Sequence, residues 1–146
     1  MIKAKFGDRI DGWIHAALPF LFRRPIDPNL LTVLGTVVSL GAAAAFGLGA
    51  FVAAGILILA GGVFDLVDGV VARHHGTATR YGAFLDSTLD RLVDMALLFG
   101  IVVHYAGAAD TGTVLVAGWA LVATVLVSYS KARAELYMKV LEGGLL

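Results

Sequence analysis

The chain has 146 residues, of which 59% are hydrophobic and only 15% are charged, and its mean hydropathy is +0.87. Soluble domains carry about 25% charged residues, so this composition excludes an ordinary soluble domain and indicates a membrane protein. Eleven basic residues balance eleven acidic ones, and the absence of cysteine excludes disulfides and thiolate metal sites. We therefore expect one integral-membrane domain over residues 1–146, with no nucleic-acid partner.

An amphipathic helix is predicted for residues 8–22, where apolar side chains recur at helical spacing. These side chains are Ile10, Trp13, Ile14, Ala17 and Leu18. Such a helix lies on a membrane surface with tryptophan at the interface, although a solvent-facing helix is the alternative. Pro25 and Pro28 then break the helical pattern, and either Asp27 or Asn29 can cap the helix that follows.

Four membrane-spanning helices are predicted after this break. They cover approximately residues 30–50, 51–73, 81–105 and 113–131. About 20 apolar residues suffice to cross a hydrocarbon core of about 30 Å. Glycine and alanine are abundant in the first of these helices, which suits close helix contacts. The predicted fold is an all-α, polytopic membrane helical bundle, in which one N-terminal surface helix precedes four spanning helices.

The basic residues predict how these helices are oriented. All of them except Arg91 lie near the N-terminus, at residues 73–80, or after the fourth helix. The turn near residue 50 and the loop at residues 106–112 contain no lysine or arginine. The positive-inside rule therefore places both termini and the connection after the second helix in the cytoplasm.

Four aspartates fall at the cytoplasmic ends of the second and third spanning helices. They are Asp65, Asp68, Asp86 and Asp90. The first two are three residues apart and the last two are four apart, so each pair shares one helix face. A short loop makes the two helices antiparallel neighbours, and the four carboxylates can converge. Because burying like charges is costly, a cation must offset them.

Hard carboxylate oxygens on rigid helices suit Mg²⁺, Mn²⁺ or Ca²⁺. Four carboxylates are enough for two divalent ions, a common device for displacement at phosphorus. Gly69 and Gly82 leave space beside the ligands, and Arg73 can neutralise a phosphate. For a single aspartate the alternative is an interhelical hydrogen bond or a pair with Arg91. We leave Asp94 outside the metal set because it can pair with Arg91 or with a basic residue elsewhere.

The run Asp65-x2-Asp68-Gly69-x2-Ala72-Arg73-x8-Gly82-x3-Asp86-x3-Asp90 resembles the signature of the CDP-alcohol phosphotransferases, also called CDP-alcohol phosphatidyltransferases, at all eight positions. The resemblance implies an enzyme that moves a phosphatidyl group from CDP-diacylglycerol, or another CDP-alcohol, to a second alcohol and releases CMP. It implies that the four aspartates hold two divalent cations, Mg²⁺ or Mn²⁺. Asp90 would also be the base that takes the acceptor's proton. A homodimer embedded in membrane lipid is implied as well.

The resemblance also implies which residues contact the substrates. The CDP-alcohol contacts would be Asn29, Thr32, Gly69, Arg73, Thr79 and Gly82. Residues 82–91 and 128–135 are similar to the phosphatidylinositol-phosphate synthase branch. Lys131 and Arg133 would then line a pocket for inositol phosphate. Glycerol 3-phosphate or another small polar alcohol is the alternative acceptor, and anchoring by positive charge is the alternative role for the two basic residues.

Members of this family usually have six spanning helices, whereas this chain has apolar length for four. We therefore expect it to lack the family's last two helices and the basic residues that the last one supplies. Two functions of other classes compete with the enzyme. A cation-handling membrane protein is less favoured because the acids cluster at one end of the helices. A non-catalytic membrane scaffold would have no need of the base Asp90.

Overall fold

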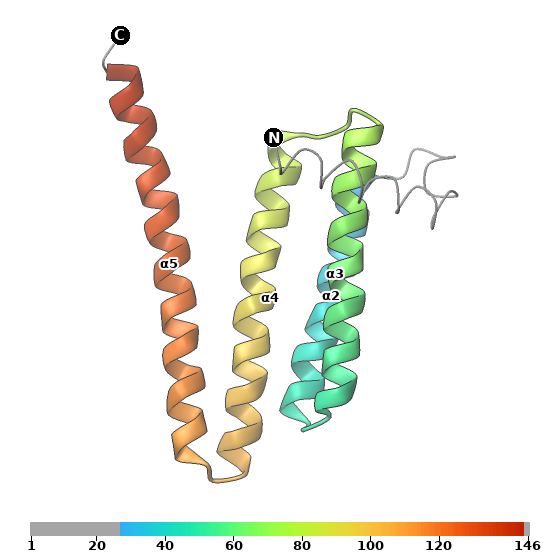
Figure 1. The fold of residues 1–146 in the computed structure, drawn as a ribbon, viewed down its shortest axis with the longest axis vertical. Coiled ribbons are helices and arrows are strands. Elements are labelled where there is room, and N and C mark those ends of the chain that lie inside the picture. Colours follow the sequence, from blue (N-terminus) through green and yellow to red (C-terminus); the bar gives the residue numbers. More distant parts are fainter. Residues whose placement is uncertain (1–26, 145–146) are drawn as a thin grey trace, which may run out of the picture. The chain divides into compact units, whose positions relative to one another are not determined.

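The computed structural model describes residues 27–144, with side chains through residue 138. This part of the chain forms four helices and no strand (Figure 1): α2 (Pro28–Gly47), α3 (Phe51–His74), α4 (Arg80–Gly107) and α5 (Thr111–Gly144). The predicted all-α fold class is therefore confirmed. The surface helix predicted for residues 8–22 lies outside the described residues.

The last helix is longer than predicted. We expected a spanning helix to about residue 131 followed by a separate amphipathic tail, but α5 runs without interruption for 34 residues (Figure 1). At about 1.5 Å per residue it is about 51 Å long, which exceeds a hydrocarbon core of about 30 Å. No glycine or proline interrupts the chain between Trp119 and Glu142, so nothing in the local sequence ends the helix where its apolar part ends.

Three helical segments in the described part of the chain are long and apolar enough to cross a membrane. They are Pro28–Gly47, Phe51–His74 and Thr111–Met138. Helix α4 has 28 residues but is not among them, because its first half carries the charged residues between Asp86 and Asp94. The predicted third span is thus a full-length helix with one polar half and one apolar half.

Polar side chains begin two of the helices. The backbone N–H of Asn29 donates to Asp27 Oδ1 at 2.9 Å, so Asp27 and not Asn29 caps α2. Pro28 then occupies the first helical position, where its missing N–H costs nothing. In the same way, the N–H of Gly82 donates to Thr79 Oγ1 at 2.9 Å and caps α4.

A residue with positive φ lies two positions after the end of each of the helices α2, α3 and α4. These residues are Gly49 (76°), Gly76 (63°) and Ala109 (56°). In each case the next backbone N–H donates to the carbonyl five residues earlier, at 2.8 to 3.0 Å, which is the Schellman motif. Glycine adopts this conformation without steric cost, whereas alanine at 109 is strained by its Cβ atom.

Two compact units make up the chain. The first comprises Met1–Ser39 and Gly55–Asp90, and the second comprises Leu40–Ala54 and Arg91–Leu146. Each unit is described separately below. The single domain expected over the whole chain stays a prediction.

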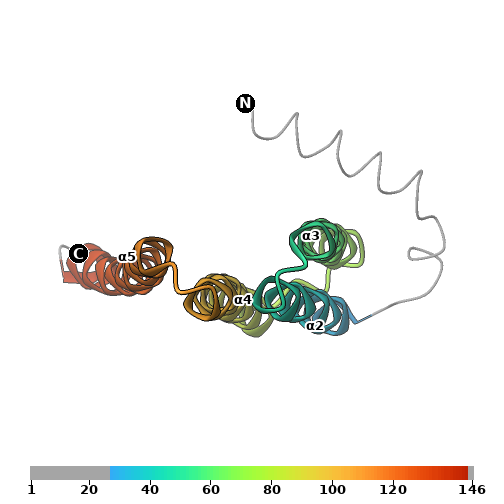
Figure 2. The ribbon, with the colours of Figure 1, turned by 90° about the horizontal axis from the view of Figure 1, so that it is seen from below.

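In the first unit α2 and α3 lie side by side, as the view along the helices in Figure 2 shows. Their backbones come close because glycine occupies both sides of the contact. A methyl group on Gly35 would lie 2.8 Å from Phe64 Cβ, and one on Gly61 would overlap the Ser39 hydroxyl. Small residues therefore set the distance between these two helices. The buried apolar side chains of this unit include Leu31, Val67, Val70 and Val71.

In the second unit the apolar half of α4 packs against the turn between α2 and α3. A methyl group on Gly100 would overlap the backbone carbonyl of Ala43. The His104 ring meets Phe51 edge to face, with centroids 5.0 Å apart. The same ring covers Gly49, where an added methyl group would lie 2.6 Å from His104 Cε1. Glycine at 49 is therefore required by both the backbone conformation and the packing.

Candidate active site

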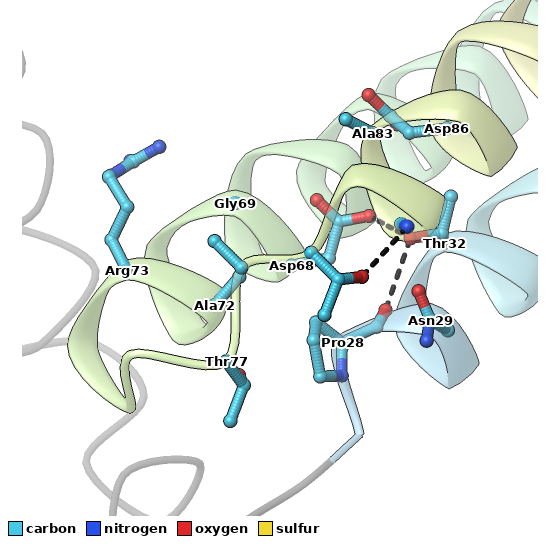
Figure 3. A pocket seen from close by; sticks show the side chains of 13 residues that line it. Pro28, Asn29, Thr32, Asp68, Gly69, Ala72, Arg73, Thr77, Ala83 and Asp86 are labelled. Atoms are coloured by element: carbon cyan, nitrogen blue, oxygen red, sulfur yellow. Dashed lines mark hydrogen bonds between the residues drawn. The ribbon is translucent and has the colours of Figure 1, made fainter.

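A pocket of about 200 Å³ lies in the first unit, where the first turns of α2 and α4 meet the last turns of α3 (Figure 3). Its lining contains all six residues expected to contact the CDP-alcohol and two of the four expected metal ligands, Asp68 and Asp86. The full set is Pro28, Asn29, Thr32, Asp68, Gly69, Ala72, Arg73, Thr77, Ala78, Thr79, Gly82, Ala83 and Asp86. Residues spread over about 60 positions of sequence are thereby brought around one cavity.

Two helix N-termini face this pocket. Pro28 and Asn29 lie in the first turn of α2, and Gly82 and Ala83 lie in the first turn of α4. Helix N-termini carry a partial positive charge, which favours phosphate groups, although the N–H groups of Asn29 and Gly82 are already bonded to the capping residues Asp27 and Thr79. Arg73 adds a full positive charge from the end of α3. The pocket therefore has the electrostatic character of an anion site beside two carboxylates.

Glycines let polar groups approach the backbone at this site. A Cβ atom on Gly69 would lie 3.3 Å from Arg73 Nη1, so the guanidinium group lies against the α3 backbone. A Cβ atom on Gly82 would lie 3.1 Å from Asn29 Oδ1 and 3.2 Å from Thr79 Oγ1. The two motif glycines thus keep space that a side chain would take from the pocket.

Asp68 is the one buried member of the four motif aspartates, at 6% exposure. Its Oδ2 atom accepts a hydrogen bond from the Thr32 hydroxyl at 2.5 Å, drawn as a dashed line in Figure 3. Asp86 faces the same pocket from α4 and is half-buried. These two carboxylates come from helices that run in opposite directions, as the short loop between them predicted.

Asp65 and Asp90 do not line the pocket. Asp65 lies against α2, with Oδ1 only 3.1 Å from the position that a Gly35 Cβ atom would take. Asp90 lies one turn beyond Asp86 on α4 and is half-buried. Electrostatic repulsion acts on Asp65 from Asp90, Asp68 and Asp86, so all four carboxylates share one region of the first unit.

This set of side chains fits a divalent cation in its chemistry. The four groups are carboxylates, the hard oxygen donors that Mg²⁺ and Mn²⁺ prefer, and their mutual repulsion favours a cation between them. Among the side chains described for residues 27–138, however, no three acidic or histidine groups already converge at the spacing of a metal site.

The expected acceptor residues lie in the second unit, and neither lines the pocket. Lys131 and Arg133 are exposed on α5. The Arg133 guanidinium group lies over the rings of Tyr129 and Tyr137, at 6.0 and 5.5 Å from their centroids. Such cation–π contacts one helical turn away on both sides restrain the arginine. Their role in acceptor binding stays a prediction.

Asp94 pairs with Arg91, as the sequence suggested when it was left outside the metal set. The Arg91 Nη1 and Asp94 Oδ2 atoms are 2.8 Å apart on the second-unit part of α4. Both side chains are nearly half exposed, so this pair contributes little to the stability of the fold.

Three lining residues were not predicted, namely Thr77, Ala78 and Ala83. Two of them lie in the loop between α3 and α4. The motif contained an indirect signal for these two, because they belong to the eight residues that connect Arg73 to Gly82. Residue type gave no signal, since threonine and alanine are not typical of a metal or phosphate site.

The chain belongs to the CDP-alcohol phosphatidyltransferase family, whose sequence model matches residues 26–141. It is accordingly an integral membrane protein. It is 43% identical to a phosphatidylinositol phosphate synthase of Streptomyces avermitilis over 118 residues, which are 80% of this chain and 48% of that protein. It is 40% identical to an archaetidylinositol phosphate synthase of Pyrococcus horikoshii over 111 residues, 76% of this chain and 56% of that protein.

Solved structures of Mycobacterium tuberculosis phosphatidylinositol phosphate synthase share the fold. The crystal structure with CDP-DAG bound matches with a TM-score of 0.73 and 31% identity, covering 91% of this chain and 64% of that one. The complex with manganese and citrate matches with a TM-score of 0.76 and 36% identity, covering 82% and 58%. The chain spans about half the length of the curated relatives it matches. The expected branch of the family is thus confirmed.

Proposed function

We propose that this chain transfers the phosphatidyl group of CDP-diacylglycerol to the hydroxyl of inositol phosphate and releases CMP, a step of phospholipid biosynthesis. The observation that carries the proposal is the pocket that gathers nine of the eleven motif and CDP-alcohol residues around one cavity. Relatives that match most of this chain are named as inositol phosphate synthases, and one was solved with CDP-DAG bound.

The pocket is assigned to the cytidine diphosphate end of the donor. The N-termini of α2 and α4 would supply the partial positive charge of the helix dipole to the diphosphate, and Arg73 would supply a full positive charge. Gly69 and Gly82 would let the nucleotide approach the backbone, with Asn29 and Thr79 beside it. Because these groups are held by helix starts, the site is largely formed before the donor arrives.

Asp65, Asp68, Asp86 and Asp90 would hold two divalent cations, Mg²⁺ or Mn²⁺. When bound, such cations neutralise the charge that develops on the phosphate leaving with CMP. A homologous structure contains manganese, which supports use of a divalent cation.

Asp90 is assigned the role of base. It lies about 6 Å further along α4 than Asp86, at 1.5 Å per residue, and therefore beyond the nucleotide pocket. The acceptor oxygen would form a bond to the donor's lipid-bearing phosphorus while the bond from that phosphorus to the CMP oxygen breaks. The acceptor's proton would pass to the Asp90 carboxylate. Lys131 and Arg133 are proposed to bind the phosphate of the acceptor.

Orientation and assembly are part of the same proposal. Both termini and the pocket would face the cytoplasm, where CMP and inositol phosphate are soluble, since the basic residues gather at that end of the helices. The protein would form a homodimer, as its family resemblance implies. Labelling of single cysteines from either side of sealed vesicles tests the orientation, and mass determination in detergent tests the dimer.

The function is tested by CMP release from the purified protein supplied with CDP-diacylglycerol, Mn²⁺ or Mg²⁺, and a panel of acceptors. Inositol phosphate should support release, whereas release with glycerol 3-phosphate alone would overturn the acceptor assignment. Asp94→Asn is the matched control for Asp90→Asn, because Asp94 lies one turn beyond Asp90 on α4 but pairs with Arg91. No release with any acceptor, from protein shown to be folded, would refute the enzymatic function.

A further inference from the structure

Thr32 makes a contact that its position in the motif did not predict. Its side chain lies in the second turn of α2 at 7% exposure, and its hydroxyl reaches Asp68 Oδ2 on α3 at 2.5 Å (Figure 3). The family resemblance had suggested a contact between Thr32 and the CDP-alcohol. A side chain with so little exposed surface has limited room for such a contact, whereas its bond to Asp68 is already formed.

The hydroxyl has one proton and two acceptors within reach. The second acceptor is the backbone carbonyl of Pro28, 3.1 Å from Thr32 Oγ1. That carbonyl begins the hydrogen-bond ladder of α2, so the helix backbone can satisfy it without a side chain. The buried Asp68 carboxylate also interacts with the backbone N–H of Gly69, but a buried carboxylate needs several donors, and hydrogen bonds to ionised groups are the shorter and stronger ones. The Thr32 hydroxyl therefore donates its hydrogen bond to the Asp68 carboxylate.

The bond from Thr32 engages Oδ2 of Asp68, a carboxylate that faces the pocket. The Thr32 hydroxyl on α2 holds Oδ2, so the carboxylate cannot rotate without losing this bond. We propose that Thr32 is a positioning residue that orients the Asp68 carboxylate for divalent-cation binding. This inference rests on the metal-dependent function proposed above. It assigns to α2, which carries none of the four aspartates, a direct part in setting the geometry of the metal ligands.

The test is a titration of Mn²⁺ by electron paramagnetic resonance, with the purified full chain and no substrate. Thr32→Val keeps the shape of the side chain and removes the hydroxyl. It should raise the Mn²⁺ dissociation constant about tenfold, the lower end of the effect seen when a partner of a metal ligand is lost. Thr32→Ser, which retains the hydroxyl, should bind Mn²⁺ as the wild type does.

Thr36→Val is the matched control. Thr36 lies one turn further along α2 and is equally buried at 8% exposure, but its hydroxyl donates to the backbone carbonyl of Thr32 at 2.9 Å. Its loss should leave Mn²⁺ affinity unchanged. Should Thr32→Val not fold, Thr32→Ala and Thr32→Ser replace it, and only the serine variant should bind Mn²⁺ normally.

Wild-type Mn²⁺ affinity in folded Thr32→Val would overturn the positioning role. If the same variant also had a raised KM for CDP-diacylglycerol, Thr32 would be a donor contact instead. Failure of the proposed function is distinguishable, because wild-type protein that binds no Mn²⁺ would remove the metal site itself.

Discussion

The contact between α2 and α3 can be tested by adding one methyl group. In Gly35→Ala the new Cβ atom would lie 2.8 Å from Phe64 Cβ, whereas carbon atoms in contact prefer about 3.5–4.0 Å. Phe64 Cβ is fixed to its backbone and cannot rotate away, so the two helices must separate by roughly 1 Å. The same methyl group would lie 3.1 Å from Asp65 Oδ1 and displace that carboxylate.

The size of the effect follows from two opposing terms. Overpacking a tight contact costs about 1–3 kcal/mol, whereas replacing glycine by alanine within a helix gains up to about 1 kcal/mol. We therefore expect Gly35→Ala to lower the free energy of unfolding by about 1 kcal/mol, the difference between these terms. Gly62→Ala is the matched control, because a Cβ atom on Gly62 meets no other atom within 4 Å. That variant should gain up to about 1 kcal/mol.

The assay is reversible denaturation in detergent, followed by circular dichroism, with both variants measured beside the wild type. Titration of Mn²⁺ adds a second observable, since only Gly35→Ala should weaken cation binding through the displaced Asp65. If Gly35→Ala proved as stable as Gly62→Ala, the close approach of the α2 and α3 backbones would be refuted.

Three further predictions concern single side chains. Ala109→Gly should raise the free energy of unfolding by about 0.5–1 kcal/mol in the same denaturation assay, because it relieves a positive φ, whereas Gly76→Ala should lower it by about 1 kcal/mol. Hydrogen bonds from the Thr113 side chain and backbone hold the pKa of Asp110 below its ordinary value. The folded pKa lies below the unfolded one, so the stabilisation is present above about pH 4 and is lost as pH falls further; melting curves of wild type and Asp110→Asn should converge in acid. Asp90→Asn should lower kcat for CMP release by about 10²-fold or more, and a smaller loss would remove it as the base.

Much of the fold could be predicted from local patterns. The apolar lengths and the break at Pro25 and Pro28 located the helices, because periodicity and turn chemistry act over a few residues. The end of α5 could not be located this way. Its apolar part stops near residue 131, but the polar residues that follow have a high propensity for helix. The helix therefore continues past the point where the polarity of the sequence changes.

The candidate site was predicted in its residue types and less well in its geometry. Spacing placed the pairs Asp65–Asp68 and Asp86–Asp90 on their helix faces, and the short loop brought the faces together. Spacing could not separate the buried Asp68 from the other three, since burial depends on which neighbour covers each position. Nor could it show that Thr77 and Ala78 line the pocket, because loop residues take their places from the helices they join.

The sequence by itself determined the membrane class, the four helices of the described chain and the family signature, because composition, periodicity and spacing are properties of the chain that folding does not alter. Only the tertiary structure decided that Gly35 brings α2 against Asp65 and that the Thr32 hydroxyl donates to Asp68. Both contacts depend on the register between helices. A hydroxyl at 32 can meet a carboxylate at 68 only after two helices have packed.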